Sequence, residues 1–193
     1  MIHVICAAYQ RIIPLRILID SFLIQSDERW KLNIIHDGEA PFEMVKMVSQ
    51  LKDNRIIFIE TEKRNECFGH PNRKKLLEKI EGEPNDFVLM TNDDNYYVPL
   101  FVEKMLKAVT HKVGVVCCNT VHSHLDYLAH GSLLVENGID MGAFIVRFDI
   151  SKSVGFNWTH HGADGSYALA CNSYCVENKL DIVNIPNLLF IHN

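Results

Sequence analysis

Short apolar segments alternate with amphipathic ones along the first 118 residues of the chain. Residues 2–8 are apolar at almost every position, which is typical of a strand buried on both faces of a sheet. Residues 14–25 repeat their apolar positions at the period of a helix and begin with proline, which is favoured in the first helical turn. The same two patterns predict further strands at 31–36, 55–60, 87–91 and 113–118, and further helices at 41–51, 73–80 and 99–110.

The pattern is less regular after residue 118. Candidate strands occupy 132–135 and 143–148, a helix is predicted over 164–177, and a last strand over 182–191 is interrupted by Pro186. The sequence contains no internal repeat, low-complexity tract or linker. This alternation predicts a single α/β domain with a mostly parallel central sheet flanked by helices.

Polar side chains follow the ends of several predicted strands. Tyr9 and Arg11 follow the first strand, Asp37 follows the second, and His192 follows the last. A cluster of asparagine and aspartate at 92–95 follows the fourth. Ligands of parallel α/β sheets bind beyond the carboxyl ends of the strands, so this pattern predicts a binding site at that edge.

Composition and charge narrow the class of protein. The 193 residues suffice for one core, and a chain that is 48% hydrophobic and 22% charged is typical of a soluble globular protein. A formal net charge of −5 argues against nucleic acid or an anionic membrane as the main partner. The sequence has no apolar stretch long enough to span a membrane and no signal peptide, so a cytoplasmic location is expected. Six cysteines without a Cys-x-x-Cys pair favour reduced, structural thiols.

Asp93 and Asp94 are the strongest candidates for chemistry on the residues alone. Two adjacent carboxylates at the end of a buried strand repel each other unless a cation or hydrogen-bond donors compensate them. Mg²⁺ or Mn²⁺ would do so, because hard oxygen ligands suit such ions, which often bridge a carboxylate to substrate phosphates. The alternative is an Asx turn that includes Asn92 and Asn95. The sequence has neither the phosphate-loop motif nor the glycine motif of dinucleotide-binding proteins.

Five short motifs occur in order along the chain. They are Ala-Ala-Tyr-Gln-Arg at 7–11, Asp-Gly at 37–38, Asn-Asp-Asp at 92–94, Gly-Ala-Asp at 162–164 and a histidine at 192. Together they resemble the motifs of glycosyltransferases with the GT-A fold, and most of all the pattern of glycosyltransferase family 2. The resemblance extends over nearly the whole chain.

The resemblance implies one GT-A (Rossmann-like) domain over residues 1–193, with 1–95 as the nucleotide-binding half and 96–193 as the acceptor-side half. It implies that Asp94 and His192 hold Mn²⁺ or Mg²⁺ and that Asp164 is the catalytic base. The other residues expected to bind the nucleotide sugar are Ala8, Tyr9, Arg11, Asp37, Arg73, Asn92 and Asp93.

The resemblance also implies individual roles, which suit the chemistry of these side chains. Asp37 would contact the base or the ribose, and Tyr9 would stack on the base. Arg11 and Arg73 are the nearest candidates for the diphosphate, because a bidentate guanidinium suits phosphate oxygens; Arg73 could equally be a solvated residue of an Arg-Lys-Lys run. The helix dipole would keep Asp164 ionised, as a general base requires, although the same position suits a helix N-cap.

Two departures from the family pattern stand out. Asn92 replaces the first aspartate of the Asp-x-Asp motif, which lowers the negative charge of the expected metal site. Ala163 replaces the first residue of the usual Glu-Asp pair, so the assignment of the base rests on Asp164 alone. Trp158, His160 and His161 are interpreted as facing the acceptor, although Trp158 suits the core equally well. His122, His124 and His130 are interpreted as part of a polar loop.

The implied activity is that of a metal-dependent hexosyltransferase. It would move a sugar from a nucleoside-diphosphate sugar, expected to be a UDP-sugar, to a hydroxyl of a carbohydrate or glycan acceptor with inversion. A nucleotidyltransferase acting on a sugar phosphate is an alternative, but residues 7–14 lack the glycine-rich loop that such enzymes usually carry. A catalytically silent nucleotide-sugar-binding domain, in which Asn92 marks a decayed site, is the other alternative.

Overall fold

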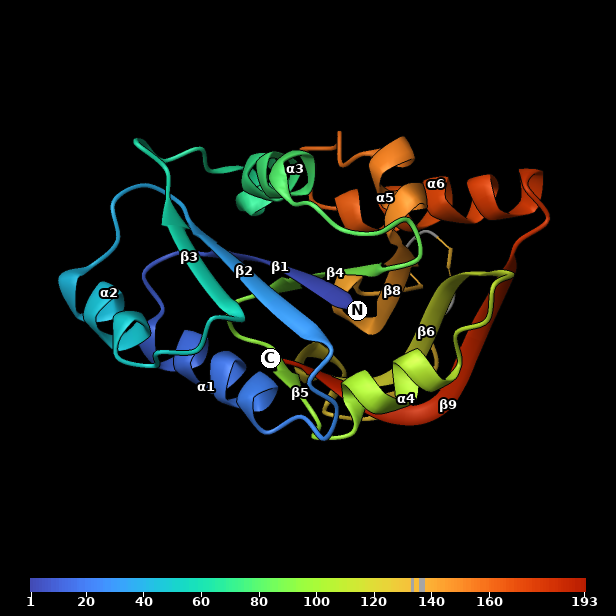
Figure 1. Ribbon diagram of the computed structural model, residues 1–193, viewed down its shortest axis with the longest axis horizontal. Coiled ribbons are helices and arrows are strands. Elements are labelled where there is room, and N and C mark those ends of the chain that lie inside the picture. Colours follow the sequence, from blue (N-terminus) through green and yellow to red (C-terminus); the bar gives the residue numbers. More distant parts are fainter. Residues whose placement is uncertain (133, 136–137) are drawn as a thin grey trace.

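A mixed sheet crosses the whole molecule, and helices cover both of its faces (Figure 1). We describe it from a computed structural model that covers all residues except 133, 136 and 137, and except the side chain of His124. Among these residues the strand order is β3-β2-β1-β4-β8-β6-β9-β5, with β7 paired to β6.

The first half of the chain forms the regular part of this sheet. Strand β1 (Ile2–Ala8) lies between β2 (Trp30–His36) and β4 (Phe87–Asn92), and β3 (Ile56–Glu60) pairs with the outer side of β2. All of these pairings are parallel. The connecting helices are α1 (Ile12–Leu23), α2 (Phe42–Ser49) and α3 (His70–Lys79).

The second half adds antiparallel pairings. Strand β8 (Phe144–Arg147) lies antiparallel between β4 and β6 (Val113–His122), and β9 (Asp181–His192) runs parallel to β6. The two-residue strands β5 (Tyr96–Tyr97) and β7 (Ala129–His130) are also antiparallel to their partners. The remaining α-helices are α4 (Phe101–Lys107), α5 (Phe148–Val154) and α6 (Ala163–Glu177), and short 3₁₀ turns occupy Cys67–Gly69, Ser123–Leu125 and Met141–Ala143.

Two apolar cores lie on the two faces of the sheet. In β1, Val4 and Cys6 face the core that contains α1, α2 and α4, whereas Ile5 faces the core that contains α3, α5 and α6. Every residue of β1 is buried for this reason, which explains its continuous apolar sequence. The predicted class, an α/β domain with a mostly parallel sheet flanked by helices, is confirmed.

Several element boundaries differ from the prediction. Helix α3 begins at His70 rather than at residue 73, because Pro71 occupies the start of the helix, where its missing N–H costs nothing. Strand β6 continues to His122, four residues beyond its predicted end at 118. Strand β9 passes Pro186 by a shift of register between Ile185 and Leu188, where a proline needs no ladder partner.

Two strand predictions in the second half are not fully met. Of the candidate strand at 132–135, residue 133 lies outside the described residues, and the other three are not in a strand. The strand predicted at 143–148 is shorter, because Phe148 begins helix α5, which the pattern did not predict.

Within the described part of the chain, no helix combines the length and hydropathy needed to cross a membrane.

Candidate active site

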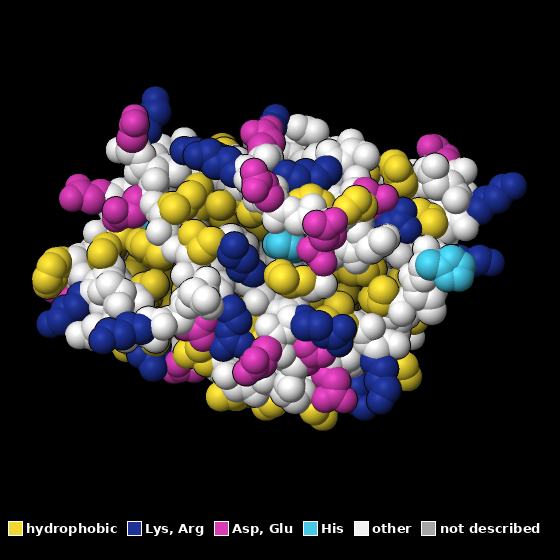
Figure 2. All heavy atoms as spheres, in the orientation of Figure 1, with side chains coloured by type: hydrophobic (Ala, Val, Ile, Leu, Met, Phe, Trp, Pro, Cys, Tyr) yellow, Lys and Arg dark blue, Asp and Glu magenta, His cyan; other side chains and the backbone are white. Residues whose placement is uncertain are grey.

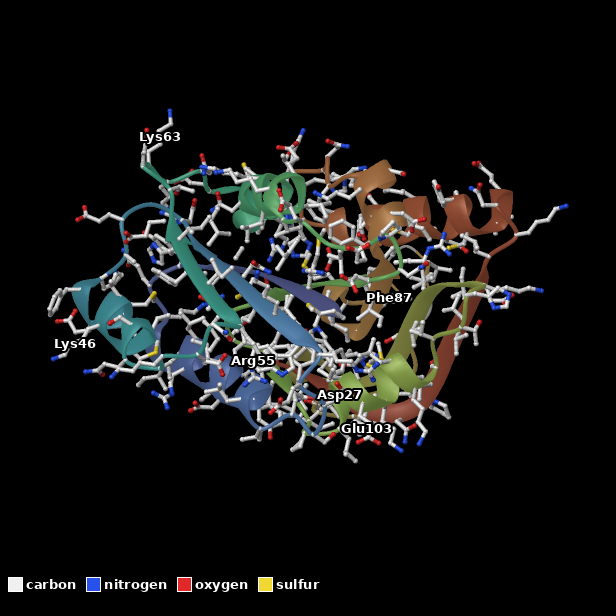
Figure 3. The ribbon with its side chains drawn as sticks, viewed as in Figure 1. Asp27, Lys46, Arg55, Lys63, Phe87 and Glu103 are labelled. Atoms are coloured by element: carbon white, nitrogen blue, oxygen red, sulfur yellow. The ribbon has the colours of Figure 1, made fainter. Side chains whose placement is uncertain are left out.

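The carboxyl ends of β1, β2, β4, β6 and β9 meet at one edge of the sheet, around a cavity of about 810 Å³. The loop after β3, which is marked by Lys63 in Figure 3, lies at the same edge of the sheet. Basic and acidic side chains are interspersed over the molecular face shown in Figure 2. All but one of the predicted site residues line the cavity: Ala8, Tyr9, Arg11, Asp37, Arg73, Asn92, Asp94, Asp164 and His192.

The exception is Asp93, which is fully buried beside the cavity. One of its carboxylate oxygens accepts a hydrogen bond from the amide of Tyr9 at 3.0 Å, and the other accepts one from Arg11. Burial raises the pKa of Asp93, and the Arg11 charge and the Tyr9 amide oppose this rise without cancelling it. Asp93 therefore holds the segment after β1 in place and does not line the cavity.

Arg11 neutralises both adjacent carboxylates. Its Nη2 donates to Asp93 Oδ1 and its Nη1 donates to Asp94 Oδ2. The cation that the sequence pattern required is therefore supplied, at least in part, by the protein itself. The second oxygen of Asp94, Oδ1, is buried and has no hydrogen-bond partner among the described residues. This oxygen is therefore the atom of Asp94 that the described part of the protein leaves without a hydrogen bond.

Arg73 is buried at the wall of the cavity, with 1% of its surface exposed. Its Nη1 donates to Phe68 O at 2.7 Å and to His70 Nδ1 at 3.1 Å, and its Nη2 donates to Asn92 Oδ1. All of these acceptors are neutral, and Nε has no hydrogen-bond partner among the described residues. Burial lowers the pKa of Arg73, but a guanidinium remains charged in proteins. The interpretation of Arg73 as a solvated surface residue is therefore excluded.

Asn92 explains why no carboxylate accepts a hydrogen bond from Arg73 at this position. An aspartate at position 92, as in the usual family motif, would place a carboxylate where the amide oxygen of Asn92 accepts the hydrogen bond from Arg73. The amide of Asn92 accepts the same hydrogen bond as an aspartate would, but it forms no ion pair with Arg73. The substitution therefore leaves a buried positive charge facing the cavity, which favours an anionic ligand.

Asp37 organises the loop that follows β3. Its Oδ1 accepts hydrogen bonds from the amide of Asn65 and the side chain of Asn72, both at 2.8 Å, and its Oδ2 accepts one from the amide of Glu66 at 3.0 Å. Residues 66–68 all have positive φ, between 49° and 58°, a conformation that costs non-glycine residues energy. The bonds to Asp37 hold this strained loop against the cavity.

Tyr9 is covered on one face of its ring by Arg64. The guanidinium carbon of Arg64 lies 4.0 Å from the ring centroid, and the ring of His36 lies 5.8 Å away at 27°. Arg64 is half-exposed and also lies 3.7 Å from Asp37. The predicted stacking of a base on Tyr9 therefore requires either the uncovered part of this ring or a movement of Arg64.

His192 is close to two residues that the sequence analysis did not assign to the site. Its Nε2 lies 3.3 Å from Asp140 Oδ2, and its ring stacks on that of His122, with centroids 3.9 Å apart and an interplanar angle of 9°. One ligand atom from each of these residues lies within 4.8 Å of the other two. His122 is not a polar-loop residue, because β6 extends to it. His130 belongs to β7, and the side chain of His124 lies outside the described residues.

Asp164 lies in the first turn of α6, with its side chain towards the cavity. It caps nothing, because the helix N-cap is Gly162 and the structure shows no side-chain cap at this end. Before it, Trp158 packs edge-on against Phe156 and belongs to the core, whereas His161 lines the cavity. Phe68 also lines the cavity next to His161; it is 64% exposed and contacts His161 edge-on, with ring centroids 5.5 Å apart.

The family model "Glycosyl transferase family 2" matches residues 3–133, which is more than half of the chain, so the protein belongs to that family. The predicted family and the GT-A fold are thereby confirmed. None of the curated proteins is significantly similar to the chain in sequence.

Solved structures of glycosyltransferases share the fold. S. aureus TarS superposes with a TM-score of 0.77 at 13% identity, over 100% of this chain and 36% of TarS. TarS 1–349 in complex with UDP-GlcNAc gives 0.73 at 13% identity, over 99% of this chain and 58% of that one. The mannosyltransferase PcManGT from Pyrobaculum calidifontis, in complex with GDP-Man and Mn²⁺, gives 0.72 at 14% identity, over 99% and 56%. The chain thus spans about one third to three fifths of the lengths of these proteins.

Proposed function

We propose that this protein transfers a hexose from a UDP-sugar to a hydroxyl of a carbohydrate acceptor. Membership of family 2 supports sugar transfer, and the complexes of TarS with UDP and UDP-GlcNAc support a uridine donor. The observation that carries the proposal is Arg73, a buried cation at the cavity wall with only neutral hydrogen-bond acceptors. A nucleoside diphosphate supplies the negative charge that this cation lacks.

The uridine end of the donor is assigned to the cavity wall formed by β1, β2 and the loop after β3. Ala8 is the last residue of β1 and Tyr9 follows it, and Asp37 follows the last residue of β2. One lone pair of the Asp37 carboxylate is not used by its three hydrogen bonds, because a carboxylate can accept about four. That position is the one proposed to contact the base or the ribose.

The diphosphate is assigned to Arg73, next to Asn92. Arg11 contributes less directly, because its guanidinium is already engaged by Asp93 and Asp94. Its role in the proposal is to keep the two carboxylates from repelling the donor. Asp93 in turn acts by positioning Arg11 and the amide of Tyr9.

A divalent ion, Mn²⁺ or Mg²⁺, is proposed at Asp94 and His192. The buried Oδ1 of Asp94, which has no hydrogen-bond partner among the described residues, and the imidazole of His192 both belong to the cavity wall. Oxygen and imidazole nitrogen are suitable ligands for Mn²⁺. When bound, such an ion stabilises the negative charge that develops on the diphosphate leaving group.

Asp164 is proposed as the base that deprotonates the acceptor hydroxyl. Its side chain lies in the first turn of α6 and lines the cavity, where a carboxylate can accept a proton from a bound hydroxyl. A base on the acceptor side gives a single displacement with inversion at the sugar. The exposed ring of Phe68 and the side chain of His161 are suited to contact the apolar face of an acceptor sugar at the same end of the cavity.

The two alternatives make different demands. A nucleotidyltransferase would require a triphosphate, whereas the cavity residues provide one buried arginine rather than a glycine-rich phosphate loop. A silent binding domain would bind a nucleotide sugar and not turn it over. Asn92 alone does not favour that alternative, because it is the hydrogen-bond partner of Arg73.

Thermal melting with UDP and Mn²⁺, added singly and together, tests the proposal. We expect UDP to raise the melting temperature more strongly with Mn²⁺ than without it. Stabilisation by a nucleoside triphosphate alone would instead favour the nucleotidyltransferase, and the absence of a shift with any nucleotide would exclude both enzymatic functions.

Two variants sharpen this experiment. Asp94→Asn should remove the metal-dependent part of the UDP shift. Asp181→Asn is the matched control, because Asp181 is exposed at the opposite end of β9 from His192. Equal shifts in the two variants would show that Asp94 is not involved in metal-dependent binding.

A further inference from the structure

Three side chains from separate segments converge at the end of the β6–β9 strand pair. His122 ends β6 and His192 ends β9, and the two residues are partners in the parallel register. Asp140 precedes the 3₁₀ turn at Met141–Ala143. Their ligand atoms lie within 4.8 Å of one another, and all three side chains are partly buried and line the cavity.

The spacing of these atoms is close to that of a metal site. Two ligand atoms that each lie about 2.1 Å from one ion are about 3.0–3.4 Å apart when the ligand–ion–ligand angle lies between the octahedral and the tetrahedral value. Asp140 Oδ2 and His192 Nε2 are 3.3 Å apart. The rings of His122 and His192 are stacked nearly in parallel, and the ligand atom of His122 lies within 4.8 Å of the other two.

The backbone around this group is fixed. Asp140 Oδ1 accepts a hydrogen bond from the amide of Gly142 at 2.7 Å, which leaves Oδ2 directed at His192. The backbone at Gly142 packs closely on Phe190, since a Cβ there would lie 2.5 Å from its ring. Such preorganised ligands bind an ion with little rearrangement.

Asp94 differs from these three residues. Its Oδ2 is engaged by Arg11, and among the described residues it does not belong to a group of three metal-binding side chains. The negative charge that Asp93 and Asp94 would offer to a cation is already compensated by the guanidinium of Arg11. A metal ion therefore gains less electrostatic stabilisation at Asp94 than it would at a carboxylate without an arginine partner.

We propose that His122, Asp140 and His192 bind the divalent ion before the donor arrives, and that Asp94 joins its ligands only once the diphosphate is bound. This proposal rests on the proposed function for the role of the ion, but not for its binding. Two imidazoles and one carboxylate form a donor set that selects Mn²⁺, Co²⁺ or Zn²⁺ over Mg²⁺, which prefers oxygen ligands and retains its waters.

The test is a titration of the untagged protein with Co²⁺ in the absence of nucleotide. Calorimetry measures the affinity, and the visible absorption of the bound ion reports its coordination. The wild-type protein should bind one Co²⁺ and show a ligand-field band, and Mg²⁺ should not displace it. His122→Gln and Asp140→Asn should each weaken the affinity for Co²⁺ by about tenfold or more. In Asp140→Asn the amide oxygen still accepts the hydrogen bond from Gly142, so the fold is preserved.

Two control variants complete the design. His130→Gln changes a histidine whose ring lies 6.4 Å from that of His122 but which is outside the group. It should leave the affinity for Co²⁺ unchanged, and Asp94→Asn should change it by less than about twofold, well below the cost of losing a ligand. Failure of the wild type to bind Co²⁺, or a loss in Asp94→Asn as large as in His122→Gln, would overturn the proposal.

These outcomes are distinguishable from failure of the proposed function. If UDP stabilises the protein together with Mn²⁺ and only Asp94→Asn removes this effect, the three-residue site is wrong and the transferase function stands. If Co²⁺ binds to the three residues but no nucleotide changes the melting temperature, the metal site stands and the transferase function is wrong.

Discussion

Arg73 donates a hydrogen bond from Nη2 to Oδ1 of Asn92 at the wall of the cavity, and this bond joins a charged group to a neutral one. The family motif has an aspartate in place of Asn92, so the usual partner of such an arginine would be a carboxylate. In the proposed function, this cation is available to an anionic ligand. Asn92 therefore changes the hydrogen-bond partner of Arg73 from a carboxylate to an amide, which leaves the guanidinium without an ion-pair partner at this position.

Restoring the motif aspartate tests this interpretation. In Asn92→Asp, the new carboxylate should neutralise Arg73 and weaken the binding of UDP without metal by about tenfold, or about 1.4 kcal/mol. The free energy of unfolding should rise by about 1 kcal/mol, because a hydrogen bond to a charged group is stronger than one to an amide. Calorimetry with UDP in the presence of a chelator measures the first effect, and unchanged affinity would contradict it.

Removing Arg11 should expose the electrostatic cost of Asp93. Arg11→Met should lower the free energy of unfolding by about 2 kcal/mol, less than for a fully buried ion pair because Arg11 is half-exposed. Adding Asp93→Asn removes the unpaired buried charge and should restore most of this loss. Urea unfolding of both variants measures it, with Arg16→Met, from the exposed pair with Asp20, as the control. A double variant less stable than Arg11→Met would count against the role assigned to Arg11.

The stability of the protein should depend on His70 below pH 6.5. Burial, followed by the charge of Arg73, lowers the pKa of His70 from 6.5 to about 4. The unfolded chain therefore takes up a proton at higher pH than the folded one, so this contribution is complete above pH 6.5 and is lost as the pH falls towards 4. Between pH 7 and pH 5 the loss is about 2 kcal/mol.

Replacing His70 isolates this effect from that of other groups. His70→Gln retains an acceptor for Arg73 and does not titrate. Between pH 7 and pH 5, the decrease in its free energy of unfolding should be smaller than that of the wild type by about 2 kcal/mol. His111→Gln, at an exposed position, should behave as the wild type. Urea unfolding at both pH values measures this, and parallel losses in wild type and His70→Gln would refute the assignment.

Gly142 should resist substitution because of its surroundings. A Cβ at this position would lie 2.5 Å from the ring of Phe190 and 2.9 Å from Tyr97 Oη. Gly142→Ala should therefore cost about 1–3 kcal/mol of overpacking. At Gly131, where the nearest atom would be 3.6 Å away, the same change should cost less than about 0.5 kcal/mol. Thermal unfolding compares the two, and equal stabilities would show that the contact with Phe190 relaxes freely.

The first half of the fold could be predicted from the sequence because its elements are set by local patterns. β1 is buried on both faces and is apolar throughout, and α1 repeats its apolar positions at a helical period. The second half depends on partners rather than on patterns. β5 and β7 have two residues each and exist because β9 and β6 lie beside them, so no local pattern could indicate them.

The same distinction applies to the cavity. Polar residues at the ends of strands were found by a rule about parallel sheets, and they do line one cavity. The engagement of Arg11 by Asp93 and Asp94 depends on the path of the chain after β1, which the sequence does not specify. His122 was missed for a simpler reason. The strand was predicted to end at 118, and the rule that selected His192 would have selected His122 had the strand been extended.

The central claim is that Asp164 activates an acceptor for attack on a bound nucleotide sugar. The most direct measurement is the release of UDP from a panel of UDP-sugars with a mixture of carbohydrate acceptors and Mn²⁺, for the wild type and Asp164→Asn, alongside the binding of UDP to both. We expect acceptor-dependent release of UDP by the wild type and equal binding by the two proteins, with release by the variant reduced by at least about a hundredfold. Equal rates of release from the two proteins would contradict the account, as would failure of both to bind UDP.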